Sequence, residues 1–369
     1  MFRGVKGWWG VSVACLVALI VTAALTLPTP FGGDAPPRDT IVAAVPWWNL
    51  PTGEARITQY QSAFSAVSPS VFRPSADGGV VSAADPQGAG GIKSDLERLH
   101  DAGIPLLPTI SNGEDGSAPD VTVRRIIHDP ALTARHVAAI LSLVKRQDLD
   151  GINVDYGDLR AADRQAFSGF VGKLATSLHA DGKVLSVSVF AKDSDAGYDE
   201  RNEAQDFAAL GRVADQVRIM AYGWHWNTSA AGPVAPLGWV RDVLQFAVSQ
   251  IPRHKILLGV STYGYSWVGK QGTLVSWLQS YGLSKKYDVP VHWDNDSQSP
   301  WLSYSDEAGV RHEVWFENSY SIGTKMKLAR EYRIGGVYLW LVGDEDDGLW
   351  KQLGHGGDVT TTADGGDGR

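Results

Sequence analysis

The chain has 369 residues, of which 44% are hydrophobic and 20% charged, with a formal net charge of −8. This is the balance of a soluble protein, and roughly 320 globular-looking residues suffice for one large domain or two ordinary ones. The acidic balance and the lack of a dense Lys/Arg run exclude nucleic acid and anionic membrane surfaces as expected partners. Because Cys15 is the only cysteine, an internal disulfide is excluded.

The N-terminal segment predicts export. Arg3 and Lys6 precede an apolar stretch, Trp8–Leu27, of about 20 residues, which is long enough to cross a bilayer. We expect residues 1–27 to be an uncleaved signal anchor, while small residues around Ala23 leave a cleaved signal peptide open. In either case the globular part lies outside the cytoplasm. The Pro/Gly-rich residues 28–39 predict a linker, and the Gly/Asp/Thr-rich residues 355–369 predict a disordered tail.

Between these ends, residues 40–354, short β-branched runs alternate with longer helical patterns. The predicted strands are Ile41–Trp47, Ala66–Phe72, Ile104–Ile110, Gly151–Tyr156, Val184–Phe190, Gln216–Tyr222, Lys255–Thr262 and Gly335–Leu341. The predicted helices are Ile92–Ala102, Ala131–Arg146, Ala161–Asp181, Phe207–Ala214, Pro236–Ser249 and Ser321–Tyr332. Such alternation predicts an α/β fold, a TIM (β/α)8 barrel. An open doubly wound sheet is the alternative, weakened because no Gly-rich phosphate loop follows the first strand.

One connection is too long for a loop. About sixty residues separate the seventh strand from the last helix, and a structureless loop of that length is improbable in a compact domain. We therefore expect a small α+β insertion, residues 266–314, at the C-terminal rim of the barrel. That rim carries the active site in this fold.

The fourth predicted strand carries polar residues where a barrel interior is expected. Residues 150–159 read DGINVDYGDL, and strand alternation places Asn153, Asp155 and position 157 on one face. Polar side chains that point into a barrel near the C-terminal end of a strand indicate a site. The alternative is a buried Asn/Asp pair that only satisfies neighbouring strands.

This stretch resembles the signature D-G-x-D-x-D-x-E of glycoside hydrolase family 18. Asp150, Gly151 and Asp155 match, Asn153 replaces the first inner Asp, and Gly157 replaces the Glu. Further segments resemble the family on the sixth, seventh and eighth strands and in its bacterial envelope and spore-cortex branch. They are MAYG at 220–223, GVSTYG at 259–264, GGVYLW at 335–340, GPVAPL at 232–237 and VWFEN at 314–318.

The resemblance implies a substrate-assisted, retaining mechanism in which the N-acetyl group of the substrate is the nucleophile. Asp155 and Tyr222 then keep the roles that orient the acetamido group. Gly157 occupies the position of the proton donor, so the resemblance implies that this acid is missing, and Gly223 replaces a further Asp of the pocket. General acid catalysis contributes typically 10²–10⁴-fold, so we expect little or no hydrolysis.

Other residues could supply the acid. Asp158 points to the opposite face of a regular strand, but a bulge at Gly157 could re-aim it. Asp344, Glu345 and Asp346 follow the eighth strand and are interpreted as a solvated loop or a charge cluster at a helix N-terminus. His225 follows the sixth strand, where a surface or hydrogen-bonded histidine is the ordinary case.

Aromatic residues at strand ends are candidates for stacking on sugar rings. Trp340 ends the eighth strand, where the family keeps the tryptophan that floors the sugar subsite. Trp48, Trp224, Trp226 and Tyr263 follow other predicted strands, and each could equally fill core or rim.

Three functions remain open. The first is binding of a chitin- or peptidoglycan-like glycan without efficient hydrolysis, the second an active glycosidase that uses Asp158, and the third a structural barrel that presents a surface to partner proteins. We expect a monomer, no cofactor and no metal, because the nine histidines lack HxxxH spacing.

Overall fold

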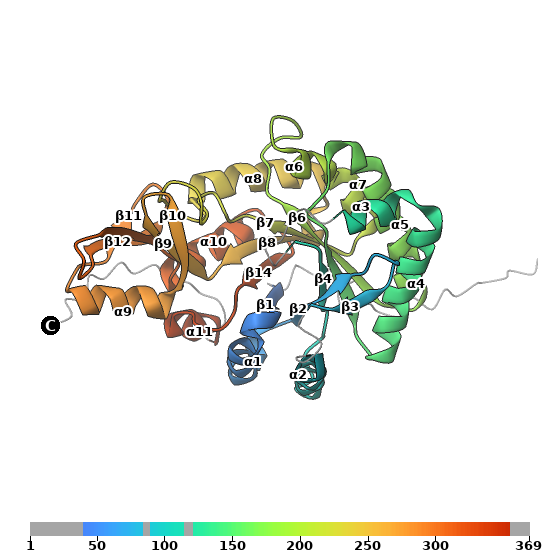
Figure 1. Ribbon diagram of the computed structural model, residues 1–369, viewed down its shortest axis with the longest axis horizontal. Coiled ribbons are helices and arrows are strands. Elements are labelled where there is room, and N and C mark those ends of the chain that lie inside the picture. Colours follow the sequence, from blue (N-terminus) through green and yellow to red (C-terminus); the bar gives the residue numbers. More distant parts are fainter. Residues whose placement is uncertain (1–39, 84–88, 114–120, 355–369) are drawn as a thin grey trace, which may run out of the picture. The chain divides into compact units, whose positions relative to one another are not determined.

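The structure, a computed structural model, describes residues 40–83, 89–113 and 121–354 (Figure 1). The predicted signal anchor or signal peptide, linker and tail lie outside these residues. Among the described helices, none is long and apolar enough to cross a membrane.

Eight parallel strands form a closed barrel within the described residues. In chain order they are β1 (Thr40–Pro46), β2 (Ala66–Pro74), β4 (Thr109–Ser111), β5 (Gly151–Asp155), β6 (Val184–Phe190), β7 (Gln216–Met220), β8 (Ile256–Ser261) and β14 (Gly336–Trp340). They pair in the order β1-β14-β8-β7-β6-β5-β4-β2, and β2 returns to β1. The predicted TIM barrel is thus confirmed. A short strand, β3 (Val80–Ser82), pairs antiparallel with β2.

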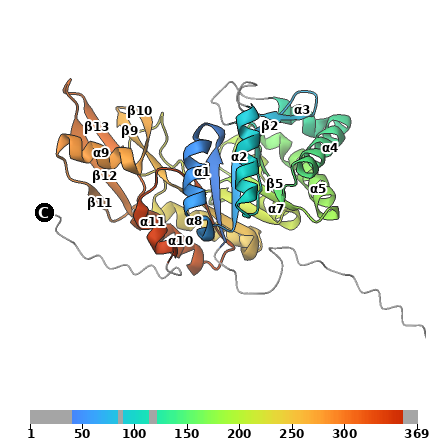
Figure 2. The same cartoon turned by 90° about the horizontal axis from the view of Figure 1, so that it is seen from below.

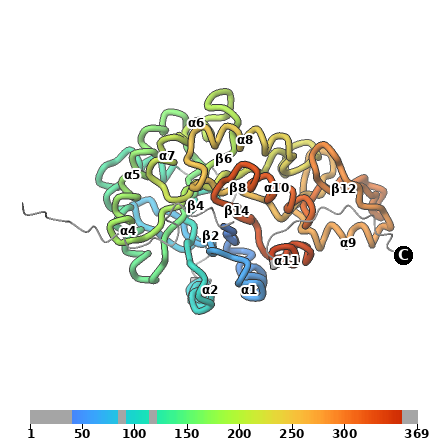
Figure 3. Tube along the Cα trace, turned by 180° about the vertical axis from the view of Figure 1, so that it is seen from behind, coloured from blue at the N-terminus to red at the C-terminus, as the bar shows by residue number. Residues whose placement is uncertain are grey.

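Helices cover the outside of this barrel (Figure 2; Figure 3). They are α1 (Leu50–Gln59), α2 (Ala89–Asp101), α3 (Thr122–His128), α4 (Pro130–Arg146), α5 (Arg164–Ala180), α6 (Glu200–Ala204), α7 (Phe207–Val213), α8 (Leu237–Gln250), α10 (Ser319–Glu331) and α11 (Asp347–Gly354). Four short 3₁₀ segments complete the set: η1 (Trp47–Asn49), η2 (Gln61–Ala63), η3 (Ala161–Asp163) and η4 (Arg253–Lys255).

Local sequence signals set several of these boundaries. The side chain of Asp129 accepts hydrogen bonds from the backbone N–H groups of Ala131 and Leu132, and Pro130 stands at the first position of α4. Both features stabilise a helix start, because the first N–H groups of a helix lack partners within it. The third strand is shorter than predicted: β4 begins at Thr109, directly after Pro108, which has no N–H to donate.

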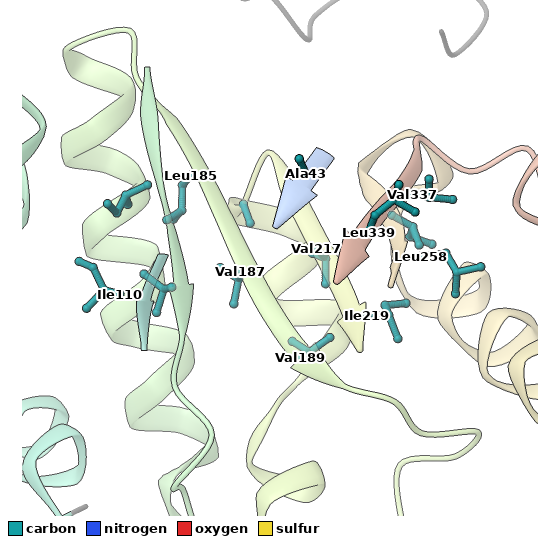
Figure 4. Packing of buried hydrophobic residues seen from close by; sticks show 14 of the residues in the cluster. Ala43, Ile110, Leu185, Val187, Val189, Val217, Ile219, Leu258, Val337 and Leu339 are labelled. Atoms are coloured by element: carbon teal, nitrogen blue, oxygen red, sulfur yellow. The ribbon is translucent and has the colours of Figure 1, made fainter. Parts of the chain in front are cut away.

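The strands bury apolar side chains on their outer face, against the helices. Leu185, Val187 and Val189 alternate along β6 and lie in the same core cluster as Leu174 of α5 (Figure 4). Each such side chain contributes roughly 1.5–3 kcal/mol of hydrophobic stabilisation. Ser186 and Ser188, which alternate with them, are buried and polar, and they face the lumen.

Between β8 and α10 the chain forms a second, antiparallel sheet. Its order is β10-β9-β13-β12-β11, with β9 (Tyr263–Val268), β10 (Gln271–Ser276), β11 (His292–Asp294), β12 (Ser299–Ser305) and β13 (Arg311–Trp315). Helix α9 (Trp277–Tyr287) packs with this sheet on a small core of its own. The sheet lies beside the barrel, on the side away from α4 and α5 (Figure 1; Figure 3). A hydrogen bond from Trp267 Nε1 to the carbonyl of Trp226, 3.2 Å long, ties it to the segment that follows β7.

Candidate active site

The polar pair on β5 divides into one internal and one accessible side chain. Asn153 is buried, and its amide nitrogen donates to Thr109 Oγ1 at 3.1 Å and to Ser188 Oγ at 3.0 Å. Both amide hydrogens are therefore used inside the barrel. Asp155, two residues further along the same strand face, is only partly buried. Of the two, Asp155 is the more exposed.

Burial raises the pKa of Asp155 from 3.8 to about 6, and the positive charge of Arg218 opposes this rise. The cause is desolvation, which disfavours the carboxylate. At neutral pH the carboxyl group is mostly ionised, although its pKa lies only about one unit below that pH. Its charge is therefore sensitive to any other charge that enters or leaves the pocket.

Arg218 was not among the residues singled out from the sequence. It lies on β7, is 1% exposed, and its Nη1 donates to Ser68 Oγ of β2 at 2.6 Å. Its guanidinium carbon lies 6.0 Å from the ring centre of Tyr338. Burial lowers the pKa of Arg218 to about 10, which leaves it protonated at neutral pH. The lumen therefore holds a full positive charge beside the predicted site.

Three tyrosines, after β7, on β14 and after β8, contact one another. The hydroxyl groups of Tyr222, which follows β7, and Tyr338, on β14, are 3.0 Å apart, and both interact electrostatically with Asp155. The ring of Tyr263 meets the ring of Tyr222 edge-on, with the centres 6.4 Å apart. Burial raises the pKa of each of these tyrosines above its ordinary value. They are therefore neutral hydrogen-bonding groups at physiological pH.

The backbone around Gly157 departs from the predicted strand. β5 ends at Asp155, and the N–H of Leu159 donates to the carbonyl of Gly157 at 2.9 Å, which bends the chain at Asp158. The regular strand thus ends two residues before Gly157, and the turn at Asp158 follows it. The N–H of Gly157 donates to Asn112 Oδ1 at 2.9 Å. A Cβ atom on Gly157 would lie 3.1 Å from Cζ of Phe190, so that ring occupies the space next to the glycine.

The four candidate tryptophans lie at or after the ends of three barrel strands, β1, β7 and β14. Trp340 ends β14 and is partly buried, and its carbonyl accepts a hydrogen bond from the N–H of Thr262 at 2.8 Å. Trp48, in η1 after β1, is 48% exposed. Trp224 packs on Trp239, with ring centres 5.3 Å apart, and keeps 48% of its surface exposed. Trp226 is 49% exposed, and its Nε1 donates to Thr228 Oγ1.

The acidic segment after β14 is not a solvated loop throughout. Glu345 is 2% exposed, and its Oε1 accepts a hydrogen bond from the N–H of Gly343. Burial raises its pKa from 4.5 to about 7. Asp346 accepts hydrogen bonds from the N–H groups of Ser319 in α10 and Gly348 in α11, as a charge at helix starts does.

A family comparison decides the assignment. Residues 62–346 match the model of the glycosyl hydrolases family 18. The chain belongs to this family. Among the described residues, no group of three or more His, Cys, Asp and Glu side chains could hold a metal ion.

Individual family 18 relatives cover different parts of the chain. The cortical fragment-lytic enzyme of Bacillus anthracis is 33% identical over 256 residues, which cover 68% of this chain. The chain spans 56–59% of the length of the first Bacillus relatives it matches. The crystal structure of a chitinase from Chromobacterium violaceum superposes with a TM-score of 0.79 at 29% identity, over 86% of this chain and 98% of that one. The spore cortex-lytic enzyme SleL of Bacillus cereus gives a TM-score of 0.77 at 27% identity, over 85% of this chain and 73% of that one.

Three buried residues near Asp155 or bonded to Arg218 were not singled out from the sequence: Arg218, Tyr338 and Ser68. A signal for two of them was present. Arg218 shares a strand face with Gln216 and Met220, and Tyr338 shares one with Trp340, so strand alternation places both in the lumen. Ser68 gave no signal, since its importance comes from a partner 150 residues away.

Proposed function

We propose that this family 18 protein binds N-acetylglucosamine-containing glycans, of chitin or peptidoglycan type, at the cell envelope and without efficient hydrolysis. The observation that carries the proposal is the set of polar side chains at the ends of β5 and β7 and on β14. Asp155 and the Tyr222–Tyr338 pair stand at the C-terminal end of the barrel, whereas position 157 carries no titratable group. The residues proposed to hold the acetamido group are kept, and the proposed proton donor is not.

The proposed roles follow from ordinary hydrogen-bond chemistry. The Asp155 carboxylate accepts from the amide N–H of the N-acetyl group, and the Tyr222 hydroxyl donates to its carbonyl. Trp340 supplies a flat apolar face for the sugar ring, and Trp48, Trp224, Trp226 and Tyr263 are proposed as further contacts at the rim. Asn153 is proposed to act indirectly, by fixing the strand on which Asp155 stands, because its amide hydrogens are used by Thr109 and Ser188.

An extracytoplasmic location is part of this proposal. It is supported by the basic residues and apolar stretch within residues 1–27 and by the similarity to the spore cortex-lytic enzyme SleL. The same relative supports peptidoglycan as a candidate glycan beside chitin.

Binding of chitotetraose and of muropeptides to the purified protein tests the proposal by calorimetry. We expect Trp340→Ala to weaken binding at least tenfold, which corresponds to about 1.4 kcal/mol. Trp293→Ala is the matched control, because Trp293 is an exposed tryptophan on the edge strand β11 of the second sheet. If the protein binds neither glycan, or if the two variants lose the same amount of affinity, the proposal is contradicted.

A second candidate function is favoured by the bend at Asp158. Since the chain leaves the regular strand after Asp155, strand alternation no longer directs Asp158 away from the pocket. An active hydrolase that uses Asp158 as the acid predicts turnover by the wild-type protein and its loss in Asp158→Asn. Release of reducing ends from chitotetraose measures both.

A further inference from the structure

Arg218 crosses the whole interior of the barrel. In the closed ring of strands, three strands separate β7 from β2 in either direction, so the two lie opposite one another. The hydrogen bond from Arg218 Nη1 to Ser68 Oγ joins these opposite strands through the lumen. A buried arginine with this reach is a fixed charge, because its two ends are held by different parts of the fold.

The pairing of this charge is incomplete. Nη2 of Arg218 donates to Gln216 Oε1 at a long 3.4 Å, and its Nε, also buried, has no hydrogen-bond partner among the described residues. Both groups that it does bond, Ser68 and Gln216, are neutral. A buried cation without a directly bonded carboxylate is costly, so its charge acts on whatever anion is nearest.

Asp155 lies at the same level of the barrel as Arg218, because Val154 of β5 pairs with Val187 of β6 and the next residue of β6, Ser188, pairs with Arg218 of β7. Among the described residues, the titratable groups that interact with Asp155 are Arg218 on β7, Tyr222 after β7 and Tyr338 on β14. The strands that flank β5 present Ser111 from β4 and Ser188 from β6, which do not titrate at these pH values. Arg218 is thus the one positive charge in this described set.

We propose that Arg218 is a positioning residue for glycan binding, which acts across the barrel lumen to keep Asp155 ionised and able to accept a hydrogen bond from the glycan amide. This inference rests on the proposed function for its ligand. The pKa values agree with the geometry: burial alone drives the pKa of Asp155 upward, and Arg218 restrains the rise. Removal of the positive charge therefore raises this pKa above about 6, and the carboxylate is lost at a higher pH.

Titration of the Asp155 carboxyl carbon by 13C NMR tests the charge effect without any ligand, with Asp155→Asn for assignment. We expect a midpoint near 6 in the wild type and a rise of about one pH unit or more in Arg218→Met, which removes the charge but keeps much of the volume. Arg218→Lys keeps the charge, and Ser68→Ala keeps the arginine, so both should stay within about 0.3 unit of the wild type.

The pH dependence of chitotetraose binding connects this effect to function. Binding should weaken as pH falls through the midpoint, and the weakening should begin at higher pH in Arg218→Met than in Arg218→Lys. An unchanged midpoint in folded Arg218→Met overturns the inference. If that variant does not fold, a rise of one unit in Arg218→Lys overturns it instead. Failure of the wild type to bind at any pH refutes the proposed function, whereas the NMR titration still decides the role of Arg218 toward Asp155.

Discussion

Replacing Gly157 with glutamate would place a carboxylic acid where the family resemblance expects the proton donor. The backbone at Gly157 is outside the positive-φ region, so it accepts a side chain. The obstacle is Phe190, whose Cζ and Cε2 atoms would lie 3.1 and 3.3 Å from the new Cβ. These distances require the ring to move by a few tenths of an ångström. The Arg201 guanidinium, 5.0 Å from the centre of that ring, would move with it.

The substitution is expected to change two separate quantities, the stability of the fold and the rate of catalysis. Overpacking costs typically about 1–3 kcal/mol of stability, and Phe190 is half-buried at the end of β6, so we expect the lower part of this range. A positioned general acid contributes about 10²–10⁴-fold in rate, or roughly 3–5 kcal/mol of the barrier. The loss of stability leaves the protein folded and does not subtract from the rate, so turnover of chitotetraose should rise by about two orders of magnitude or more in Gly157→Glu.

Reducing-end release from chitotetraose measures this rate, and circular dichroism melts confirm folding. Gly157→Gln is the matched control, because glutamine has nearly the same volume as glutamate but cannot act as a general acid. Gly157→Glu/Phe190→Leu relieves the contact with the ring and should be at least as active as the single variant. If both glutamate variants fold, bind chitotetraose and remain as slow as Gly157→Gln, then position 157 is not where the acid belongs and the reasoning fails.

Two further predictions concern buried charges. Glu345→Gln should raise the free energy of unfolding by on the order of 2–3 kcal/mol at pH 8. The reason is that the pKa of Glu345 in the folded protein, about 7, exceeds its ordinary 4.5, so ionisation favours unfolding. Urea melts should show that the stability difference between variant and wild type shrinks as pH falls from 7 to 4.5, and a constant difference would contradict the prediction. Lys325→Met should cost about 3–5 kcal/mol, because Lys325 and Glu317 are each 1% exposed and bonded at 2.8 Å, so the change strands a buried carboxylate. Adding Glu317→Gln should recover most of that loss, and equal stability of the single and double variants would count against the explanation.

The barrel could be predicted from the sequence because its strands and helices repeat in a regular alternation. The strands Val184–Phe190 and Gly336–Trp340 show the β-branched or aromatic runs that identify buried parallel strands. Helices such as α1 and α6 were not predicted. α1 contains Pro51 and Gly53, which weaken a helical pattern, and α6 has five residues, too few for a visible period.

Parts of the candidate site formed by residues adjacent in the sequence could be predicted, whereas parts that depend on distant residues could not. Asp155 stands in a recognisable segment, but its charge depends on Arg218, which sequence alone does not place across the lumen. A departure from the regular strand at Gly157 was only an alternative from the sequence, because the bend depends on the hydrogen bond between Gly157 and Leu159 and on Asn112, 45 residues away. Glu345 looked like part of a solvated acidic run, although packing against Gly343 and Arg56 buries it.

The chain enters the second sheet through β9 and leaves it through β13, and these two strands are neighbours. β9 follows β8 with only Thr262 between them, and β13, which leads to α10, pairs directly with β9 through Trp315 and Tyr265. The two ends of the inserted segment therefore lie on adjacent strands, whatever the length of the segment. The elements β10, α9, β11 and β12 can accordingly be lengthened, shortened or exchanged together while the barrel keeps its register.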